Sequence, residues 1–256
     1  MGKNKLKKFA DMASYRHVFE ADFADLMTEG VPHPHHMKGQ WHSWFGNNNP
    51  IVVELGCGRG EYAVGLARAF PNVNYIGVDI KGARMHAGAT QAVNEGLTNV
   101  AFIRTRIEFI ECFFDQNEVD QIWVTFPDPQ MNKVRKRLVG TLMLQRYRSF
   151  LNPAGALHLK TDSPFLFAYT TAMLEANNIT PQACTDNLYE AQPAPLDSVA
   201  MSIRTYYEQK WIDAGLSIKY IRFAIPTSQT LVEPNVEIEH DNYHNVGRSV
   251  RIIERN

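Results

Sequence analysis

Cysteine is scarce in this chain of 256 residues, and its three thiols follow no C-x-x-C spacing. Cys57, Cys112 and Cys184 are odd in number and irregular in spacing, so neither a disulfide framework nor a cysteine zinc site is indicated. No apolar run approaches the roughly 18 residues that span a bilayer. The basic N-terminus, residues 1–8, has no apolar signal core. These absences predict a cytoplasmic protein that binds neither a metal nor a membrane.

Net charge is also lacking, because 26 basic side chains nearly balance 27 acidic ones and leave a formal charge of -1. That balance argues against a protein that binds nucleic acid through a basic surface all round. Yet acidic residues are absent between Asp128 and Asp162. The cations of this interval are Lys133, Arg135, Lys136, Arg137, Arg146, Arg148 and Lys160. An ordinary solvated face mixes both signs, so the interval favours a phosphate-binding surface, with a solvated face as the alternative.

Strand and helix patterns alternate along the chain from Pro50 onward. Short apolar runs predict strands over residues 51–55, 73–80, 99–103, 119–126, 156–160 and 217–225. Helical patterns lie between them, over residues 61–70, 83–94, 138–151, 165–175 and 205–213, with a further one after the third strand. This order predicts an α/β fold with a Rossmann-like, doubly wound, mostly parallel sheet. A loop or lid is expected over residues 180–200, and the tail beyond Pro226 has no clear pattern.

The first 49 residues differ from the rest and are expected to form a basic, aromatic arm ahead of a domain over residues 50–256. Apolar side chains at helical spacing predict a helix over residues 15–26. A loop rich in proline, histidine and asparagine follows it. Its histidines are His33, His35, His36 and His42. No cysteine or carboxylate lies near them at ligand spacing, so a solvated loop, or a substrate arm with Trp41 and Trp44, is favoured over a metal site.

A glycine-rich loop, Glu54-Leu55-Gly56-Cys57-Gly58-Arg59-Gly60-Glu61, joins the first strand of the domain to its first helix. Alternate glycines let the backbone approach a ligand at the carboxyl edge of a parallel sheet. Asp79 ends the second strand, where a carboxylate can accept hydrogen bonds from both hydroxyls of a ribose. Glu61 stands where a dinucleotide fingerprint has its third glycine, and its charge would repel a pyrophosphate.

The acids around the loop favour S-adenosyl-L-methionine, a nucleoside cofactor with a positive sulfonium and no phosphate. Glu54 supports this choice through its negative charge, and Gly56 and Gly58 would lie against the cofactor. A tight strand–helix turn that binds nothing is the alternative interpretation of the loop. Cys57 is interpreted as a small turn residue rather than a nucleophile.

Asp128 lies between two prolines in Thr125-Phe126-Pro127-Asp128-Pro129, after the fourth predicted strand. Each proline fixes its own φ, and Pro129 keeps Asp128 out of the helical region. At this edge of the sheet the carboxylate would stand beside a methyl donor. Guanine N7 has a free lone pair, so its methylation needs no base, only placement and an anion near N1–H and N2–H₂. A turn-capping role is the alternative for Asp128.

Two later groups also fall at ends of predicted elements. Lys160-Thr161-Asp162 ends the fifth strand, and Thr205-Tyr206-Tyr207-Glu208 opens a late helix. Thr205 and Glu208 have the spacing of a capping box, an interpretation that is compatible with contact to a substrate.

Together these residues resemble the bacterial tRNA (guanine-N7-)-methyltransferase family, whose members methylate a variable-loop guanosine (m7G46). The resemblance runs from about Val52 to Phe223. It rests on the glycine loop, on Asn74-Tyr75-Ile76-Gly77-Val78-Asp79, on the Phe-Pro-Asp-Pro turn and on the two later groups. The turn combined with Lys-Thr-Asp and Thr-x-Tyr-Glu is much more specific than the loop. The resemblance implies a class I methyltransferase fold, S-adenosyl-L-methionine as cofactor and tRNA as partner.

The resemblance also implies roles for single residues. Asp128 would be the central catalytic acid. Cofactor contacts would come from Glu54, Gly56, Gly58, Asp79, Arg106 and Asp128. Guanosine or tRNA contacts would come from Asp162, Thr205, Tyr206, Tyr207 and Glu208.

Three departures from the family pattern accompany the resemblance. The family usually has an acid near the adenine after the third strand, where this chain has Arg106. Arg106 cannot accept from an adenine amine, so that contact would be lost or move to Glu108 or a backbone carbonyl. The chain is two residues shorter after Pro129, so the substrate contact of the family's lysine falls on Asn132 or Lys133. In the third departure an aspartate, the last residue of the second strand, replaces the more frequent glutamate.

The resulting hypothesis is transfer of a methyl group from S-adenosyl-L-methionine to guanine N7 in tRNA. Phosphates would be bound by Lys133, Arg135, Lys136 and Arg137, with the N-terminal lysines extending that surface. A methyltransferase for another acceptor is an alternative, although it leaves the acid-free interval unexplained. A non-catalytic RNA-binding subunit with the same fold is a second alternative, and Glu61 disfavours an NAD oxidoreductase. No obligatory protein partner is evident.

Overall fold

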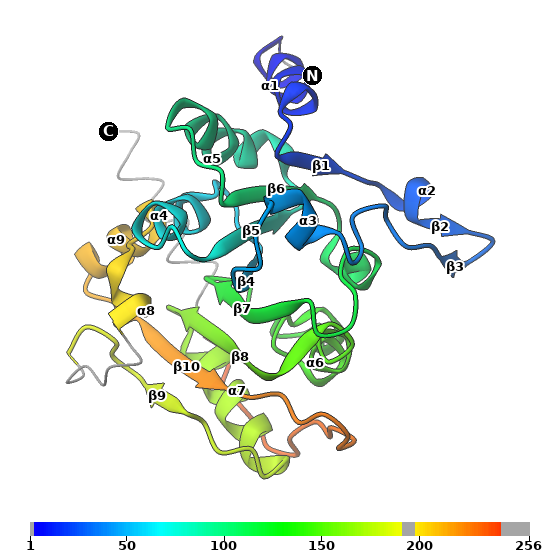
Figure 1. The fold of residues 1–256 in the computed structure, drawn as a ribbon. Coiled ribbons are helices and arrows are strands. Elements are labelled where there is room, and N and C mark those ends of the chain that lie inside the picture. The colour runs from blue at the N-terminus through cyan, green and yellow to red at the C-terminus, as the bar shows by residue number, and fades with distance from the viewer. Residues whose placement is uncertain (1–2, 191–197, 242–256) are drawn as a thin grey trace.

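One eight-stranded sheet forms the centre of the computed structural model, which describes residues 3–190 and 198–241 (Figure 1). The strands lie in the order β1-β6-β5-β4-β7-β8-β10-β9. Their bounds are β1 (Val18–Glu20), β4 (Ile51–Leu55), β5 (Asn74–Asp79), β6 (Val100–Arg104), β7 (Val119–Thr125), β8 (Leu151–Thr161), β9 (Ala183–Thr185) and β10 (Lys219–Phe223). β10 runs antiparallel to both of its neighbours, and the other neighbouring strands pair in parallel. The chain order reverses between β4 and β7, the place where ligands of open α/β sheets bind.

Helices cover both faces of the sheet (Figure 1). They are α1 (Lys3–Ser14), α2 (Phe23–Leu26), α3 (Trp41–Phe45), α4 (Glu61–Ala69), α5 (Gly82–Asn94), α6 (Thr141–Tyr147), α7 (Pro164–Ala176), α8 (Ser198–Ser202) and α9 (Tyr206–Asp213), with 3₁₀ helices η1 (Ile107–Cys112) and η2 (Val134–Lys136). Helices α1, α4, α5 and α9 pack on the face that carries Val52 and Phe102. Helices α3, α6 and α7 pack on the opposite face, which carries Val53 and Ile103. The predicted doubly wound, mostly parallel α/β fold is therefore confirmed.

The central strand β4 shows how the sequence determines this architecture. All five of its residues are buried, as expected of a parallel strand that helices cover on both sides. Four of them are apolar, and the fifth is Glu54. A carboxyl group inside a central strand is unfavourable unless hydrogen bonds satisfy it, so Glu54 marks a position that serves more than packing.

The predicted helix over residues 15–26 is confirmed only at its end, as α2, and is wrong before that. Val18–Glu20 instead forms the edge strand β1 and pairs in register with Phe102–Arg104 of β6. The β-branched and aromatic side chains of this segment gain more from pairing with an open sheet edge than from a local helix. The N-terminal helix lies earlier, as α1, and packs against α5. The division of the chain into residues 1–49 and 50–256 stays a prediction, with β1 of the first part joined to the sheet of the second.

Other predicted elements differ in extent. The helix expected over residues 138–151 is limited to α6, because Gly140 caps its start and Leu151 already begins β8. The expected loop over residues 180–200 contains β9 and the start of α8, while residues 191–197 lie outside the described residues. The tail is described from residue 226 to residue 241 without a helix or strand, and residues 242–256 lie outside the described residues. A short hairpin of β2 (Met27–Thr28) and β3 (Val31–Pro32) extends away from the sheet (Figure 1).

Candidate functional site

The glycine loop forms a tight turn at the carboxyl end of β4. Gly56, Gly58 and Gly60 have positive φ values of 81°, 55° and 73°, a conformation that side-chain-bearing residues rarely adopt. Space matters as well at Gly60, where a Cβ atom would lie 2.7 Å from the ring of Phe102. Asp79 holds the loop from the neighbouring strand, because its Oδ2 accepts a hydrogen bond of 2.9 Å from the amide of Gly58. The loop is therefore built before any ligand binds.

Glu54 is buried beneath this loop and connects three elements. Its exposed fraction is 4%, and its carboxyl group accepts hydrogen bonds from the Thr125 hydroxyl at 2.7 Å and from the Ala63 amide at 3.1 Å. Burial raises the pKa of Glu54 to about 7, and the charges of Asp79 and Glu61 add to the rise while the two hydrogen bonds oppose it. A positive charge bound nearby would favour the ionised form of Glu54.

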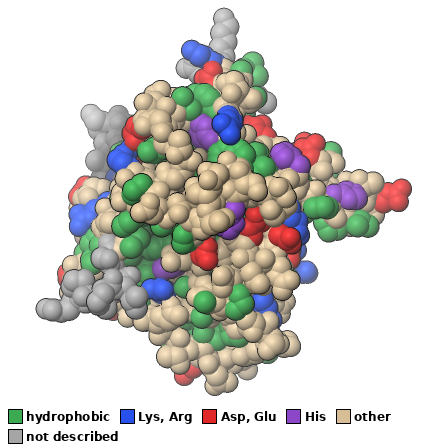
Figure 2. Space-filling model, in the orientation of Figure 1, with side chains coloured by type: hydrophobic (Ala, Val, Ile, Leu, Met, Phe, Trp, Pro, Cys, Tyr) green, Lys and Arg blue, Asp and Glu red, His purple; other side chains and the backbone are tan. Residues whose placement is uncertain are grey.

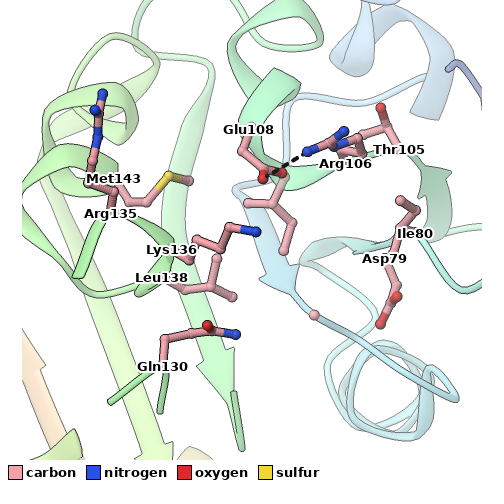
Figure 3. Close-up of a pocket in the computed structure, with 12 residues that line it drawn as sticks. Asp79, Ile80, Thr105, Arg106, Glu108, Gln130, Arg135, Lys136, Leu138 and Met143 are labelled. Atoms are coloured by element: carbon pink, nitrogen blue, oxygen red, sulfur yellow. Dashed lines mark hydrogen bonds and ion pairs between the residues drawn. The ribbon is translucent and has the colours of Figure 1, made fainter. Parts of the chain in front are cut away.

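Two cavities open at the carboxyl edge of the sheet and share Gly56 and Asp79. The smaller, of about 180 Å³, is called the acidic cavity because the acids Glu54, Glu61 and Asp79 line it, together with Thr125 and Phe126 at the end of β7. Three cations, Arg59, Lys81 and Arg84, also line it. The larger, of about 330 Å³, is lined by both apolar and polar side chains (Figure 3). The apolar ones include Ile80, Ile107, Leu138 and Met143, and the polar ones include Thr105, Arg106, Glu108, Gln130, Arg135 and Lys136.

The shape and charge of the two cavities fit S-adenosyl-L-methionine. The acidic cavity offers both signs of charge, which suits the amino-acid end of the cofactor because that end carries an ammonium, a carboxylate and the sulfonium. The larger cavity has the apolar walls that a nucleobase needs. Asp79 lies where the cavities meet, and its remaining lone pairs can accept hydrogen bonds from ribose hydroxyls. Gly56 and Asp79 line both cavities, while Glu54 and Gly58 line the acidic one.

Cys57 also lines the acidic cavity, and its side chain is almost entirely buried. Burial raises the pKa of its thiol well above the ordinary value, and the negative charges of Glu54 and Asp79 raise it further. The thiolate is the nucleophilic form of cysteine, so this environment disfavours a nucleophilic role. Backbone hydrogen bonds from Gly56 and Cys57 to the Val78 carbonyl fit the interpretation as a turn residue.

Arg106 lines the larger cavity and turns toward Glu108, with 3.4 Å between a guanidinium nitrogen and a carboxylate oxygen (Figure 3). Thr105, the residue before it, was not predicted from the sequence. Thr105 is 2% exposed, and its Oγ1 has no hydrogen-bond partner among the described residues. Thr105 lines the larger cavity, and a rotation of its buried side chain would offer this hydroxyl to a base amine. Its position just after β6, at the edge of the sheet where ligands bind, is the sequence feature that could have identified Thr105 as a site residue.

The Asp128 turn follows β7 directly, beside the acidic cavity. Phe126 leaves the strand with a φ of 50°, and Pro127 and Pro129 are buried on either side of Asp128. Asp128 itself is exposed. Its Oδ1 accepts one hydrogen bond, of 3.1 Å, from the amide of Gln130. The carboxylate is thus held by its own turn and faces outward, where a substrate can reach it.

The cations between Asp128 and Asp162 do not form one surface. Lys133, Arg135 and Lys136 are exposed and have no ion-pair partner among the described residues, and Asn132 is exposed beside them. Arg137 is buried, at 6% exposure, so the prediction that it binds phosphates is wrong. Figure 2 shows lysine and arginine side chains scattered over the face in view, with acidic ones between them.

The other cations of the interval are bound within the protein. Arg146 pairs with Glu111 and donates to the carbonyl of Glu108, and Arg148 donates to the carbonyl of Gln229. Lys160 is fully buried. Only the segment around residues 133–136 therefore remains as the predicted phosphate-binding surface.

Lys160 and Glu208 form a fully buried ion pair with a nitrogen–oxygen distance of 2.7 Å. Burial lowers the pKa of Lys160, and the charge of Glu208 opposes that shift. Glu208 also accepts from the hydroxyl of Tyr189 at 2.6 Å and completes the capping box with Thr205. The predicted capping box is therefore confirmed, and a direct substrate contact by Glu208 does not fit its burial.

Helix α9 places its first turn at the acidic cavity. Thr205 and Tyr207 line that cavity, and the amide of Tyr206 donates to Glu61 at 3.0 Å. The guanidinium of Arg59 lies 5.7 Å from the centre of the Tyr206 ring. Tyr206 and Tyr207 are 49% and 45% exposed. The structure thus brings the late Thr-Tyr-Tyr segment and the glycine loop together.

Asp162 follows β8 and is nearly buried, at 6% exposure. Burial raises its pKa to about 6, and the charge of Asp241 adds to that shift. Its Oδ1 has no hydrogen-bond partner among the described residues. Asp162 does not line either cavity of the candidate site, so a substrate contact by this residue stays a prediction.

The histidine-bearing loop packs as an aromatic cluster. The His35 ring lies 4.1 Å from that of His36 and 4.5 Å from that of Phe113, and burial lowers the pKa of His35 to about 4. Trp41 is fully buried, and its amide donates to Glu118 at 3.0 Å. Across the described ranges, no three metal-ligating side chains come together, and no helix is long and apolar enough to cross a membrane.

Comparisons with known proteins give consistent results. The model of a family described as "Putative methyltransferase" matches residues 48–221. A tRNA (guanine-N(7)-)-methyltransferase of Bacteroides thetaiotaomicron is 56% identical over 98% of this chain and 97% of its own length. One of Porphyromonas gingivalis is 50% identical over 94% of this chain and 98% of its own length. Among solved structures, the 16S rRNA methyltransferase KamB has a TM-score of 0.54 at 13% identity and covers 78% of this chain and 99% of its own, which supports the fold.

Proposed function

This chain belongs to the family of S-adenosyl-L-methionine-dependent tRNA (guanine-N(7)-)-methyltransferases, and on that premise we propose that it methylates the variable-loop guanosine of tRNA (m7G46). One observation carries the proposal. The exposed carboxylate of Asp128 follows directly after Thr125 and Phe126, which line the acidic cavity. A base held by Asp128 therefore lies next to the place where a methyl donor fits.

The residues around the two cavities hold the cofactor. S-adenosyl-L-methionine supplies an electrophilic methyl group on a positively charged sulfur. Glu54, Glu61 and Asp79 offset that charge, and Asp79 accepts hydrogen bonds from the ribose hydroxyls. The adenine lies in the larger cavity, where the Thr105 hydroxyl and the Glu108 carboxylate replace the acid that the family usually carries at the position of Arg106.

Asp128 positions the guanine and does not act as a base. The N7 atom attacks with its own lone pair, so no proton has to leave before the methyl group is transferred. The base becomes positively charged during the transfer. Asp128 accepts hydrogen bonds from N1–H and N2–H₂ at the opposite edge of the guanine, which fixes its orientation and stabilises the charge that develops.

The rest of the tRNA contacts the surface around the turn. Lys133, Arg135 and Lys136 bind phosphates, since they are exposed and carry no partner charge in the described part of the chain. Asn132 lies in the same exposed segment, and the rings of Tyr206 and Tyr207 stand at the mouth of the acidic cavity. A variable-loop guanosine is stacked in the tRNA body, so its unstacking costs on the order of a few kcal/mol. The predicted cytoplasmic location fits a tRNA substrate.

The proposal is tested with unmodified tRNA and cofactor labelled in its methyl group. We expect label in N7-methylguanosine at the variable-loop position, detected by cleavage of the tRNA at the alkali-labile nucleoside. Label in another nucleoside, or in a protein or small molecule, would favour the other-acceptor hypothesis. An absence of cofactor binding in calorimetry would favour the non-catalytic RNA-binding subunit.

A further inference from the structure

Arg137 is a buried cation that contacts the end of the Asp128 turn. It follows η2, and its guanidinium carbon lies 4.2 Å from the centre of the Tyr169 ring and 4.9 Å from that of Phe165. No carboxylate in the described ranges lies within ion-pair distance of it. The two aromatic faces of α7 therefore stabilise its charge.

The hydrogen bonds of Arg137 go to the two residues that follow Pro129. Its Nε donates to the Gln130 carbonyl at 3.2 Å, and its Nη2 donates to the Met131 carbonyl at 2.7 Å. Gln130 has a φ of 48°, a conformation that is unfavourable for a residue with a side chain. The amide of Gln130 in turn donates to the Asp128 carboxylate. A continuous chain of contacts thus connects α7, Arg137, Gln130 and Asp128.

We propose that Arg137 is a positioning residue that holds the Asp128 turn in its reactive geometry, and that the tRNA does not contact it. This inference rests on the proposed function, because it assumes that Asp128 orients the guanine. A planar guanidinium can bond two successive carbonyls and lie on two rings at once, whereas an ammonium cannot reproduce that geometry. Without these bonds only the hydrogen bonds of Gln130 with Asp128 and with the Lys133 amide support its strained conformation, and the Asp128 carboxylate shifts away from the base.

A phosphate-binding role makes the opposite predictions for the same residue. A phosphate contact depends mainly on charge, so lysine would largely preserve it. Its loss would weaken tRNA binding and reduce the salt dependence of that binding by about one phosphate. A positioning role leaves both quantities unchanged and lowers the rate of methyl transfer. Arg137→Lys therefore separates the two roles.

The first experiment compares R137K and R137M with the wild type on one tRNA, after the wild type has been shown to form N7-methylguanosine. We expect kcat to fall by about tenfold to a hundredfold in both variants, because small displacements of a positioned group have effects of that size. The Kd for tRNA, its salt slope and the Kd for S-adenosyl-L-methionine should stay at wild-type values. Hydrogen exchange should accelerate in residues 128–133. A wild-type kcat in R137K, or a lower salt slope, would overturn the proposal.

Matched controls separate this outcome from a general loss of structure. Arg68 also makes a forked contact, with Glu95, but on α4 and away from both cavities, so R68K should keep the wild-type kcat. Tyr169→Leu removes one supporting ring while leaving Arg137 in place, and it provides the test should both Arg137 variants unfold. We expect the same pattern from it, a lower kcat with unchanged tRNA affinity, and a wild-type kcat in Y169L would contradict the proposal.

Chemical rescue provides a readout that a general packing role would not give. A cavity of about 610 Å³ adjoins Arg137 and is lined by Met131, Phe165, Tyr169 and Glu233 among others, so a small cation can reach the vacated place in R137A. Guanidinium, at concentrations well below those that unfold the protein, should raise the kcat of R137A. Methylammonium, or sodium chloride at the same ionic strength, should not. Equal effects of all three salts would count against a specific guanidinium contact.

Discussion

Two carboxylates on neighbouring strands show how differently one fold can treat the same chemical group. Glu54, on β4, is buried, with its oxygens bonded to Thr125 and Ala63. Asp128, just beyond β7, is exposed and accepts from a single backbone amide of its own turn. The first belongs to the core of the sheet, and the second projects from a turn.

The difference reflects the two ligands that the site must handle. A cofactor of constant structure fits a pocket that is already formed, so its residues are held by the sheet and by the glycine loop. A base within a folded RNA must enter from solvent, so the residue that meets it has to be exposed. The Asp128 turn is consequently supported by buried groups, the Lys160 carbonyl of β8, which accepts from the Phe126 amide, and Arg137, which lies on two rings of α7.

The largest expected effect comes from removing one partner of the buried ion pair that joins β8 to α9. Lys160→Met should lower the free energy of unfolding by about 3–5 kcal/mol, because Glu208 is left as a buried, unpaired charge. Chemical denaturation measures the loss. The double variant K160M/E208Q should recover part of it, and a double variant no more stable than K160M would contradict the assignment of the loss to the unpaired charge.

The next effect concerns rate alone. Asp128→Ala should lower methyl transfer by about a hundredfold or more, because the guanine loses both its orientation and an anion near its developing charge. Binding of S-adenosyl-L-methionine, measured by calorimetry, should stay unchanged, since Asp128 lies outside the core of the pocket. Near-normal turnover in this variant would rule out the role assigned to Asp128.

A smaller effect should appear in the pH dependence of cofactor binding, which the buried carboxyl group of Glu54 controls. Glu54 has a pKa of about 7, so it is largely neutral below that pH and ionised above it. A cationic sulfonium favours the ionised form, so affinity for S-adenosyl-L-methionine should rise with pH, by up to about tenfold per unit below pH 7, and then level off. The neutral product S-adenosyl-L-homocysteine should show a weaker rise. Calorimetry on both ligands measures the difference, and E54Q should abolish it.

The same raised pKa has a consequence for the stability of the ligand-free protein. Its folded value lies above the ordinary value of 4.5, so the contribution of Glu54 to stability is fully present below pH 4.5. This contribution is lost as the pH rises through about 7, because ionisation is then unfavourable in the buried site. Saturating cofactor should reduce that loss, which thermal unfolding at several pH values can measure.

The smallest expected effect comes from substituting the exposed cations that follow the Asp128 turn. Lys133→Met with Arg135→Met should weaken tRNA binding about threefold to tenfold and reduce the salt slope by about two phosphates. The maximal rate at saturating tRNA should change little. Binding measured from low to moderate salt provides the slope, and an unchanged slope would assign these side chains to an ordinary solvated face.

Local patterns in the sequence were enough to predict the centre of the fold. Apolar, β-branched runs such as Ile51–Leu55 favour strands, and the glycines of the loop permit the positive φ values that its turn requires. The proline-flanked Asp128 was predictable for the same reason, because Pro127 and Pro129 constrain it directly. These features depend on residues that are close together in the chain.

Features that depend on distant contacts could not be predicted in this way. The burial of Arg137 follows from Phe165 and Tyr169, and the pairing of Lys160 with Glu208 joins β8 to α9 across 48 positions. Both cations carry the same charge as their exposed neighbours, so charge counting placed them on one surface. The edge strand β1 shows the same limit, since its partner β6 lies more than 80 positions away.

The glycine loop also places a sulfur nucleophile beside an alkylating agent. The Cys57 thiol lines the same cavity as the carboxyl groups of Glu54 and Asp79, and a thiolate there could compete with the RNA for the methyl group. The carboxylates that favour a cationic donor raise the pKa of this thiol and keep it protonated. One set of negative charges therefore serves two purposes, attracting the methyl donor and protecting the protein from methylating itself.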